Sequence, residues 1–98
     1  MKLQVLDLAE ADLLSGFKFY ERQSAGVGGY FLDSLSAEIE SLHLYAGVHR
    51  KYLGYFRMLS RRFPYAIYYR ITGDEIQVHR ILDCRREPRW IRNQLRTA

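Results

Sequence analysis

The chain has 98 residues, enough for one domain with a single modest core and little else. Its hydrophobic fraction of 48% and aromatic fraction of 14% are typical of a folded globule and exclude an intrinsically disordered tail. The formal net charge is +4, and no apolar run approaches the roughly 20 residues needed to cross a bilayer, which excludes a membrane-spanning protein.

The N-terminal part of the sequence predicts a strand followed by a helix. Residues 2–6 alternate in a pattern typical of a half-buried strand. Asp7 and Glu10 have the spacing of a capping box, which marks the start of a helix. We expect this helix to end near Ser24, because three glycines follow within a few positions.

A loop and a second helix are predicted next. The glycines of residues 26–29 predict a loop, and without a following Lys-Ser or Lys-Thr it is not a phosphate-binding motif. From about Tyr30 to Tyr45 apolar residues recur every three or four positions, which predicts a helix. Two helices joined by a short loop form an antiparallel hairpin, whose shared apolar face needs a sheet to cover.

The second half of the sequence predicts three strands. Residues 46–51 are expected to form a loop, and residues 53–59 resume a strand-like pattern. In residues 63–71 the odd positions are aromatic or β-branched, which is typical of a strand with one buried face. A turn at 72–74 leads into a last strand at 75–83, so these two strands are expected to form a hairpin.

These elements predict an α+β fold in the order β-α-α-β-β-β, within a single domain covering residues 1–98. The small antiparallel sheet carries the helical hairpin on one face, and a short C-terminal helix starts at Pro88. The other face of the sheet is expected to stay partly open. Arg80 shares the parity of the apolar residues in the last strand, so it extends to solvent, pairs with an acid, or marks a β-bulge.

Charge is distributed unevenly along the chain. Up to His49 there are three lysines and arginines against seven carboxylates, whereas from Arg50 onward there are twelve against four. Most of the later cations are arginines, which bind carboxylates and phosphates through a planar fork. This pattern indicates a binding surface for nucleic acid, for an acidic protein, or for both, and the plain alternative is a solvated basic face.

Several short motifs follow one another along the chain: Ala11-Asp12-Leu13, Phe19-Tyr20-Glu21, Gly28 to Leu32, Tyr55-Phe56-Arg57, Phe63-Pro64-Tyr65, Ile67-Tyr68-Tyr69, and Arg85-Arg86-Glu87-Pro88-Arg89-Trp90. Taken in this order, they resemble the RelE/ParE superfamily of bacterial toxins from type II toxin–antitoxin modules. The resemblance spans nearly the whole chain and implies the same β-α-α-β-β-β arrangement. It also implies a cognate, acidic antitoxin that wraps the toxin and neutralises it in a hetero-oligomer.

The chain departs from this family's ribonucleases at two positions. Asp83, followed by Cys84, stands where the family often has a histidine, just before Arg-x-x-Pro. Trp90 or Ile91 stands nearest the late catalytic tyrosine, and neither side chain can act as an acid. The Phe-Pro-Tyr and Arg-x-x-Pro motifs favour the ParE-like branch, whose characterised members act on DNA gyrase and do not cut RNA.

The candidate target-binding residues are mainly arginines, which we expect to gather around one hollow of the sheet. They are Arg57, Arg61, Arg62, Tyr65, Arg85, Arg86, Arg89 and Trp90. Tyr65, Tyr68 and Tyr69 could stack on bases or simply pack on the sheet.

RNA cleavage would need a base for the 2′-hydroxyl, an acid for the leaving oxygen, and cations for the developing charge. The candidate set for that reaction is Arg57, Arg61, His79, Asp83 and Arg85, with His49 as a further titrating group. Structural or solvated roles are the alternative for each, and for Asp83 the alternative is an ion pair with Arg85 or Arg57.

The single cysteine, Cys84, excludes an internal disulfide and is consistent with a reducing cytoplasm. We expect no signal peptide, because Met1-Lys2-Leu3 leads directly into a strand-like segment without an apolar core or a cleavage site. We expect no metal site, because three dispersed histidines and one cysteine lack metal-ligand spacing, and no cofactor. Cationic neighbours could lower the pKa of the Cys84 thiol, but no base accompanies it as a nucleophile would require.

Three functional hypotheses follow. The first is the toxin of a type II toxin–antitoxin (plasmid stabilisation) module that arrests growth by binding DNA gyrase, with no chemistry of its own. The second is a RelE-like endoribonuclease that cuts mRNA on the ribosome. The third is a non-toxic, arginine-rich binding domain. The sequence leaves open whether the protein is an enzyme.

Overall fold

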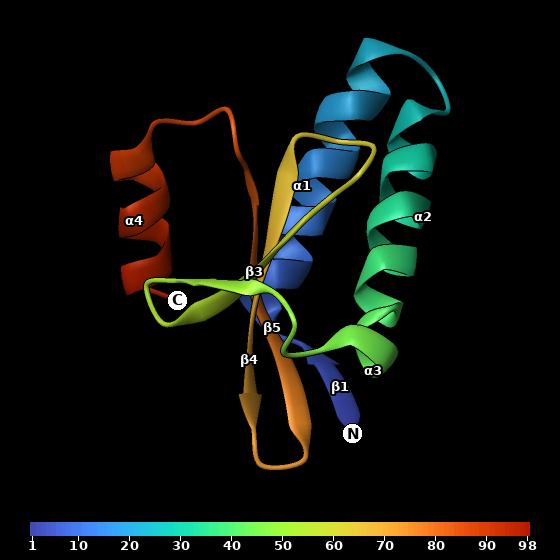
Figure 1. The fold of residues 1–98 in the computed structure, drawn as a ribbon. Coiled ribbons are helices and arrows are strands. Elements are labelled where there is room, and N and C mark those ends of the chain that lie inside the picture. The colour runs from blue at the N-terminus through green and yellow to red at the C-terminus, as the bar shows by residue number, and fades with distance from the viewer.

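A computed structural model describes residues 1–98, in which a five-stranded sheet separates two layers of helix (Figure 1). The strands are β1 (Lys2–Val5), β2 (Arg50–Tyr52), β3 (Tyr55–Leu59), β4 (Tyr65–Thr72) and β5 (Glu75–Asp83). Their order across the sheet is β1-β5-β4-β3-β2. The fold is α+β as expected, with one refinement: β1 pairs with β5 in parallel, so the sheet is mixed.

The helices lie on both sides of this sheet. They are α1 (Asp7–Gln23), α2 (Val27–Glu40), α3 (Leu42–Tyr45) and α4 (Pro88–Arg96). Helices α1 and α2 form the predicted antiparallel hairpin on one face, and α4 lies on the other face (Figure 1). None of them is both long enough and apolar enough to span a membrane.

The main core lies between the helical hairpin and the sheet. The odd positions of β4 face it, as the alternation in the sequence predicted, and Tyr65, Ile67 and Tyr69 are all buried there. Phe31 and Leu35 of α2 are fully buried against them. Thirteen buried residues belong to this cluster, which therefore supplies most of the hydrophobic stabilisation of the fold.

The expectation that the second face of the sheet stays partly open is correct for only part of that face: α4 covers the region around Ala66 and Tyr68, whereas Arg70 and Thr72 at the end of β4 are exposed. Tyr68 and Leu82, on the even positions of their strands, are buried beneath Ile91 and Leu95 of α4. The Tyr55 hydroxyl also donates a hydrogen bond to the Leu95 carbonyl at 3.1 Å. Residues 65–69 of the central strand β4 are consequently buried on both faces.

The junction between α1 and α2 is shorter than the glycines indicated. Residues 24–26 form the turn, Gly26 is its only glycine, with φ at +90°, and α2 begins at Val27. The Glu21 carboxylate accepts hydrogen bonds from the backbone N–H groups of Gly26 and Gly28, at 3.0 and 2.9 Å. It thus occupies the N-terminus of α2, where a negative charge is stabilised and otherwise unpaired donors are satisfied.

Three further boundaries differ from the predictions. Leu6 is the N-cap of α1 and Asp7 its first residue, so the predicted capping box does not form, although Asp7 and Glu10 still lie in the first turn. The second helix is interrupted at Ser41, which separates α2 from α3. Finally, β2 begins at Arg50, inside the predicted loop at 46–51, and is joined to β3 by a tight turn.

The irregular parity of Arg80 is explained by both a β-bulge and an ion pair. The register between β4 and β5 shifts between Tyr68 and Tyr69, so that Tyr68 faces Arg80 while Tyr69 faces Val78. His79 is the extra residue, and the bulge turns Arg80 away from the main core. Arg80 is buried and bonded to Asp12 of α1.

Candidate target-binding surfaces

The structure divides the candidate residues between two surfaces on opposite sides of the sheet, so the expectation of a single hollow is wrong. The first surface is a groove of about 740 Å³ between α2 and the end of β3, and it contains Arg61 and Arg62. We call it the α2–β3 groove. The second surface is formed by α4 and the segment before it, and it contains Arg86, Arg89 and Trp90. We call it the α4 face.

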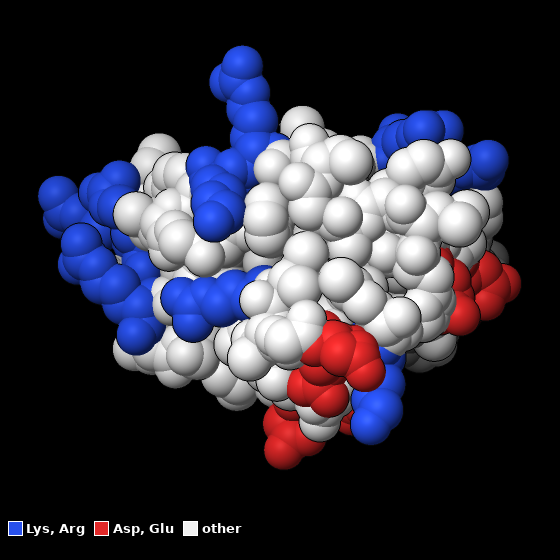
Figure 2. Space-filling view, turned by 60° about the horizontal axis from the view of Figure 1, so that its bottom comes forward, with Lys and Arg blue, Asp and Glu red and all other residues white.

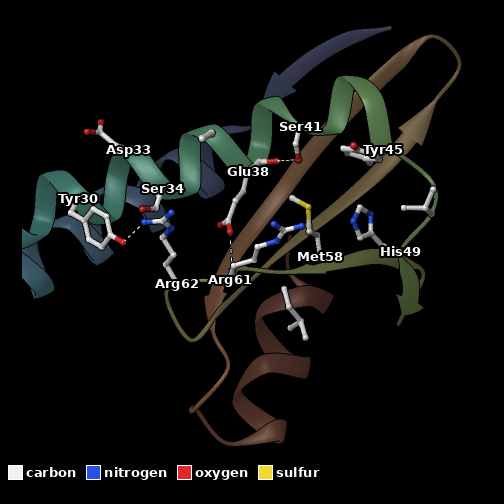
Figure 3. Close-up of a pocket in the computed structure, with 13 residues that line it drawn as sticks. Tyr30, Asp33, Ser34, Glu38, Ser41, Tyr45, His49, Met58, Arg61 and Arg62 are labelled. Atoms are coloured by element: carbon white, nitrogen blue, oxygen red, sulfur yellow. Dashed lines mark hydrogen bonds between the residues drawn. The ribbon is translucent and has the colours of Figure 1, made fainter.

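Both arginines of the α2–β3 groove are held by residues of α2. The Arg62 guanidinium donates a hydrogen bond to the Tyr30 hydroxyl at 2.6 Å and lies 5.6 Å from the ring centroid (Figure 3). The Glu38 carboxylate accepts a bond from the backbone N–H of Arg61 at 2.8 Å. The Arg61 side chain therefore remains free to reach a partner in the groove.

Large apolar side chains around this groove are exposed. Tyr45, Val48 and Leu59 have exposed fractions of 56%, 73% and 57%. The outer edge of β2 has no neighbouring strand, so its backbone groups are available as well. Exposed apolar surface beside exposed arginines and an open strand edge is typical of a protein-binding site.

Arg57 lies on the opposite face of the sheet from the main core. It faces Tyr68 across the β3–β4 pair and donates hydrogen bonds to the Tyr68 hydroxyl at 3.2 Å and to the Cys84 sulfur at 3.6 Å. Burial raises the pKa of the Cys84 thiol in spite of this neighbouring cation, so the thiol stays protonated at neutral pH. Arg57 is thus a positioned, half-buried cation next to the start of the α4 face.

The α4 face begins with a stacked pair. The Arg86 guanidinium lies 3.8 Å from the centroid of the Trp90 ring, a cation–π contact that orients both side chains. Arg89 is exposed on the same helix. In the space-filling view, the blue side chains gather on the side of the molecule that carries α4 (Figure 2).

Arg85 and Asp83 form an ion pair with each other. The Arg85 side chain donates to the two Asp83 carboxylate oxygens at 3.0 and 2.7 Å, and its backbone N–H donates to the same carboxylate at 2.8 Å. These hydrogen bonds lower the pKa of Asp83. The predicted alternative for Asp83, an ion pair with Arg85, is what the structure contains.

Tyr65 is part of the main core. Its exposed fraction is 8%, and its ring packs edge-on against Phe31 at 4.9 Å between centroids. Burial, followed by the nearby Asp83 carboxylate, raises the pKa of Tyr65 to about 12. Its ring therefore has no free face on which a base or a partner side chain could stack.

The candidates for RNA cleavage do not converge. His79 packs edge-on against Tyr55 on the α4 side of the sheet, and burial, together with Arg70, lowers its pKa. Asp83 lies four residues further along β5, which corresponds to about 13 Å along a strand. Asp83 pairs with Tyr65 on the hairpin side of the sheet, whereas Arg57 faces the α4 side. The structure therefore does not place an acid and a base close enough together to act on the same phosphate.

Sequence reasoning missed several residues of these surfaces. Tyr30 lies on an expected helix, but nothing in the sequence indicated that it would hold Arg62. Arg92 and Arg96 follow Arg89 at helical spacing, a signal that was present in the sequence. Arg70 lies over the Tyr55 ring at 4.0 Å, which depends on strand pairing that the sequence alone does not give.

Comparisons with known proteins agree with this fold. A family model described as the ParE toxin of the parDE type II toxin–antitoxin system matches residues 3–88. Among solved structures, a chain from the chromosomal ParDE TA system of P. aeruginosa superposes with a TM-score of 0.76 at 22% identity, over 83% of this chain and 92% of that one. No protein with curated annotation matches the sequence. The family match covers most of the chain, and this protein therefore belongs to the ParE toxin family of type II toxin–antitoxin systems.

Proposed function

We propose that this protein is a toxin that arrests growth in the cytoplasm by binding DNA gyrase, and that a cognate antitoxin neutralises it by forming a hetero-oligomer. The observation that carries the binding mechanism is the separation of the candidate acid–base residues. Asp83 is engaged by Arg85 on one side of the sheet, and His79 lies on the other. Binding requires only the arginines, which are present on both surfaces.

The antitoxin is proposed to occupy the α2–β3 groove. An acidic amphipathic helix would place apolar side chains on Val48 and Leu59 and carboxylates near Arg61 and Arg62. The open edge of β2 could accept an added strand from the same partner. A plasmid-stabilising role would then follow if the antitoxin is degraded faster than the toxin.

Induced expression in a sensitive bacterial host tests the toxin assignment. The expected result is growth arrest with filamentation, relieved when the adjacent antitoxin gene is expressed. Normal growth at verified expression levels would contradict the proposal and favour a non-toxic binding domain.

Two assays then separate the targets. In a supercoiling assay, purified protein is expected to inhibit DNA gyrase, and ribosome-coupled mapping is expected to show no new mRNA ends. Cuts at the ribosomal A site with normal supercoiling would instead establish a ribonuclease. A Val48→Asp/Leu59→Asp variant tests the groove: it should remain toxic but escape the antitoxin. A matched pair outside the groove, Leu8→Asp/Leu14→Asp on α1, should still be neutralised.

A further inference from the structure

The outward face of α4 carries a row of arginines. Arg89, Arg92 and Arg96 follow one another at spacings of three and four, which places them within one narrow sector of the helix. The apolar residues Ile91 and Leu95 point to a different sector and are buried against the sheet. Because α4 is anchored by those two residues, its arginines are displayed on a fixed support.

No carboxylate neutralises this row. The three ion pairs in the protein join His43 to Glu40, Arg80 to Asp12 and Arg85 to Asp83, and none of them includes an arginine of α4. Glu87 is the only acidic side chain from residue 84 onward. The positive charge of the row is therefore available to an external partner.

The row continues beyond α4 at both ends. At its C-terminal end, Arg96 and Arg70 of β4 line the same small cavity, together with Leu53 and Tyr55. At the other end Arg86 is held against Trp90. Basic side chains from β4, from the segment before α4 and from α4 itself thus lie on one side of the molecule, where Figure 2 shows several blue groups with white surface between them. We call this set the arginine stripe: Arg70, Arg86, Arg89, Arg92 and Arg96.

We propose that the arginine stripe binds the phosphate backbone of duplex DNA. Sequence-independent binding of proteins to duplex DNA comes mainly from lysine and arginine side chains that neutralise phosphates. Apart from Leu53 and Leu95 in the small cavity beside Arg70 and Arg96, the stripe offers mainly charge. The α2–β3 groove exposes Tyr45, Val48 and Leu59, so it fits an amphipathic helix better than the stripe does. Its one surface aromatic residue, Trp90, is covered by Arg86, so it offers no stacking platform for single-stranded bases.

This inference deepens the proposed function, since gyrase holds duplex DNA while it works. A toxin that contacts both would bind the gyrase–DNA complex more tightly than gyrase alone. The groove and the stripe lie on opposite sides of the sheet, so an antitoxin in the groove need not displace DNA from α4.

DNA binding is measured without gyrase, using the free protein and a fluorescein-labelled 20-base-pair duplex in fluorescence anisotropy. The test variant is Arg89→Ala/Arg92→Ala/Arg96→Ala. The control is Lys2→Ala/Lys18→Ala/Arg22→Ala, which removes the same charge from exposed positions on β1 and α1. Thermal unfolding establishes that both variants fold.

The wild type and the control are expected to bind the duplex with micromolar affinity at low salt, and the α4 variant at least about tenfold more weakly. Each phosphate contact contributes about −0.9 to the slope of log K against log salt, so losing three contacts should flatten that slope by about 2.7. Equal losses in both variants would overturn the inference, as would an undetectable affinity of the wild type or tighter binding of duplex RNA or polyglutamate.

Binding to gyrase without DNA is measured separately by surface plasmon resonance. If the protein binds DNA but does not bind gyrase, the proposed target is wrong and the inference about the arginine stripe is unaffected. If it binds gyrase but not DNA, only the inference about the arginine stripe is wrong.

Discussion

The Asp12 carboxylate of α1 and the Arg80 guanidinium of β5 form a two-pronged ion pair, with oxygen–nitrogen distances of 2.7 and 2.9 Å. The same carboxylate accepts the backbone N–H of Ile81 at 2.9 Å, and Arg80 also donates to the Gln94 carbonyl of α4 at 3.3 Å. One side-chain pair therefore joins the hairpin layer, the sheet and α4.

Removing Asp12 should destabilise the fold strongly. Asp12→Ala leaves Arg80 charged and buried without its partner, and leaves the Ile81 N–H unpaired, which together should cost about 3–5 kcal/mol of unfolding free energy. Urea unfolding at pH 7 measures this loss. The exposed Asp33→Ala on α2 should change stability by less than about 0.5 kcal/mol. A similar, small effect of both substitutions would contradict the assigned role of the pair.

Two neighbouring glycines of α2 should respond in opposite directions to alanine. A Cβ at Gly28 would lie 2.6 Å from the Phe17 carbonyl oxygen, so Gly28→Ala should separate α1 from α2 and cost about 1–3 kcal/mol. A Cβ at Gly29 meets nothing within 4 Å, so Gly29→Ala should stabilise the helix by about 0.4–1 kcal/mol. Thermal unfolding of the two variants provides the comparison. If both substitutions change the free energy of unfolding in the same direction, the helices pack differently from the arrangement described here.

The stability of the protein should decrease as the pH falls below neutrality. The Gly47 N–H donates to the Tyr69 hydroxyl, which is also hydrogen-bonded to Nδ1 of the half-buried His49. Burial lowers the pKa of His49, and burial with Arg70 lowers that of His79. Their contribution is complete above the unfolded pKa of about 6.5 and is lost as the pH falls through the lower folded value.

Urea unfolding between pH 7.5 and 5 measures this dependence. His49→Gln should give a shallower pH dependence than the wild type, because only His79 then titrates with a lowered pKa. An unchanged slope would mean that burial does not lower the pKa of His49 in the folded protein.

Arg57 should matter for toxicity more than for folding. It is half-buried beside Tyr68 and Cys84 but makes no ion pair, so Arg57→Gln keeps a donor for Tyr68 while removing the charge. We expect reduced toxicity of this variant at an unchanged melting temperature, and full toxicity of Arg22→Gln on the exposed face of α1. Full toxicity of Arg57→Gln would exclude this cation from the target surface.

The helices and strands with a clear hydrophobic periodicity could be predicted from the sequence. A strand that forms only because it pairs with a neighbouring strand could not. The alternation from Phe63 to Ile71 predicted β4 and its core-facing side correctly, because burial of one face imposes that pattern. β2 has only three residues and no pattern of its own, and it exists because β3 turns back on it through Leu53 and Gly54, both at positive φ.

The same distinction applies to the candidate site. The arginine-rich second half of the sequence indicated a binding surface, but the division of that surface into two depends on which face of the sheet each side chain takes. The bulge at His79 changes that assignment for every later residue of β5, including Asp83, and one sequence does not specify it. Because α4 packs on the second face, Tyr68 is buried there, although the alternation of residues 63–71 predicted burial of the odd positions only.

The parallel pairing of the first strand with the last has a consequence for synthesis on the ribosome. Lys2 pairs with Glu75, and Leu3 with Ile76, so the N-terminal strand has no hydrogen-bonding neighbour until three quarters of the chain has been made. The helical hairpin, closed locally by Glu21, can form early, but it has no complete sheet to cover until β5 emerges. A nascent chain should consequently remain inactive until translation is nearly finished, and an antitoxin already present would meet the toxin at the moment it folds.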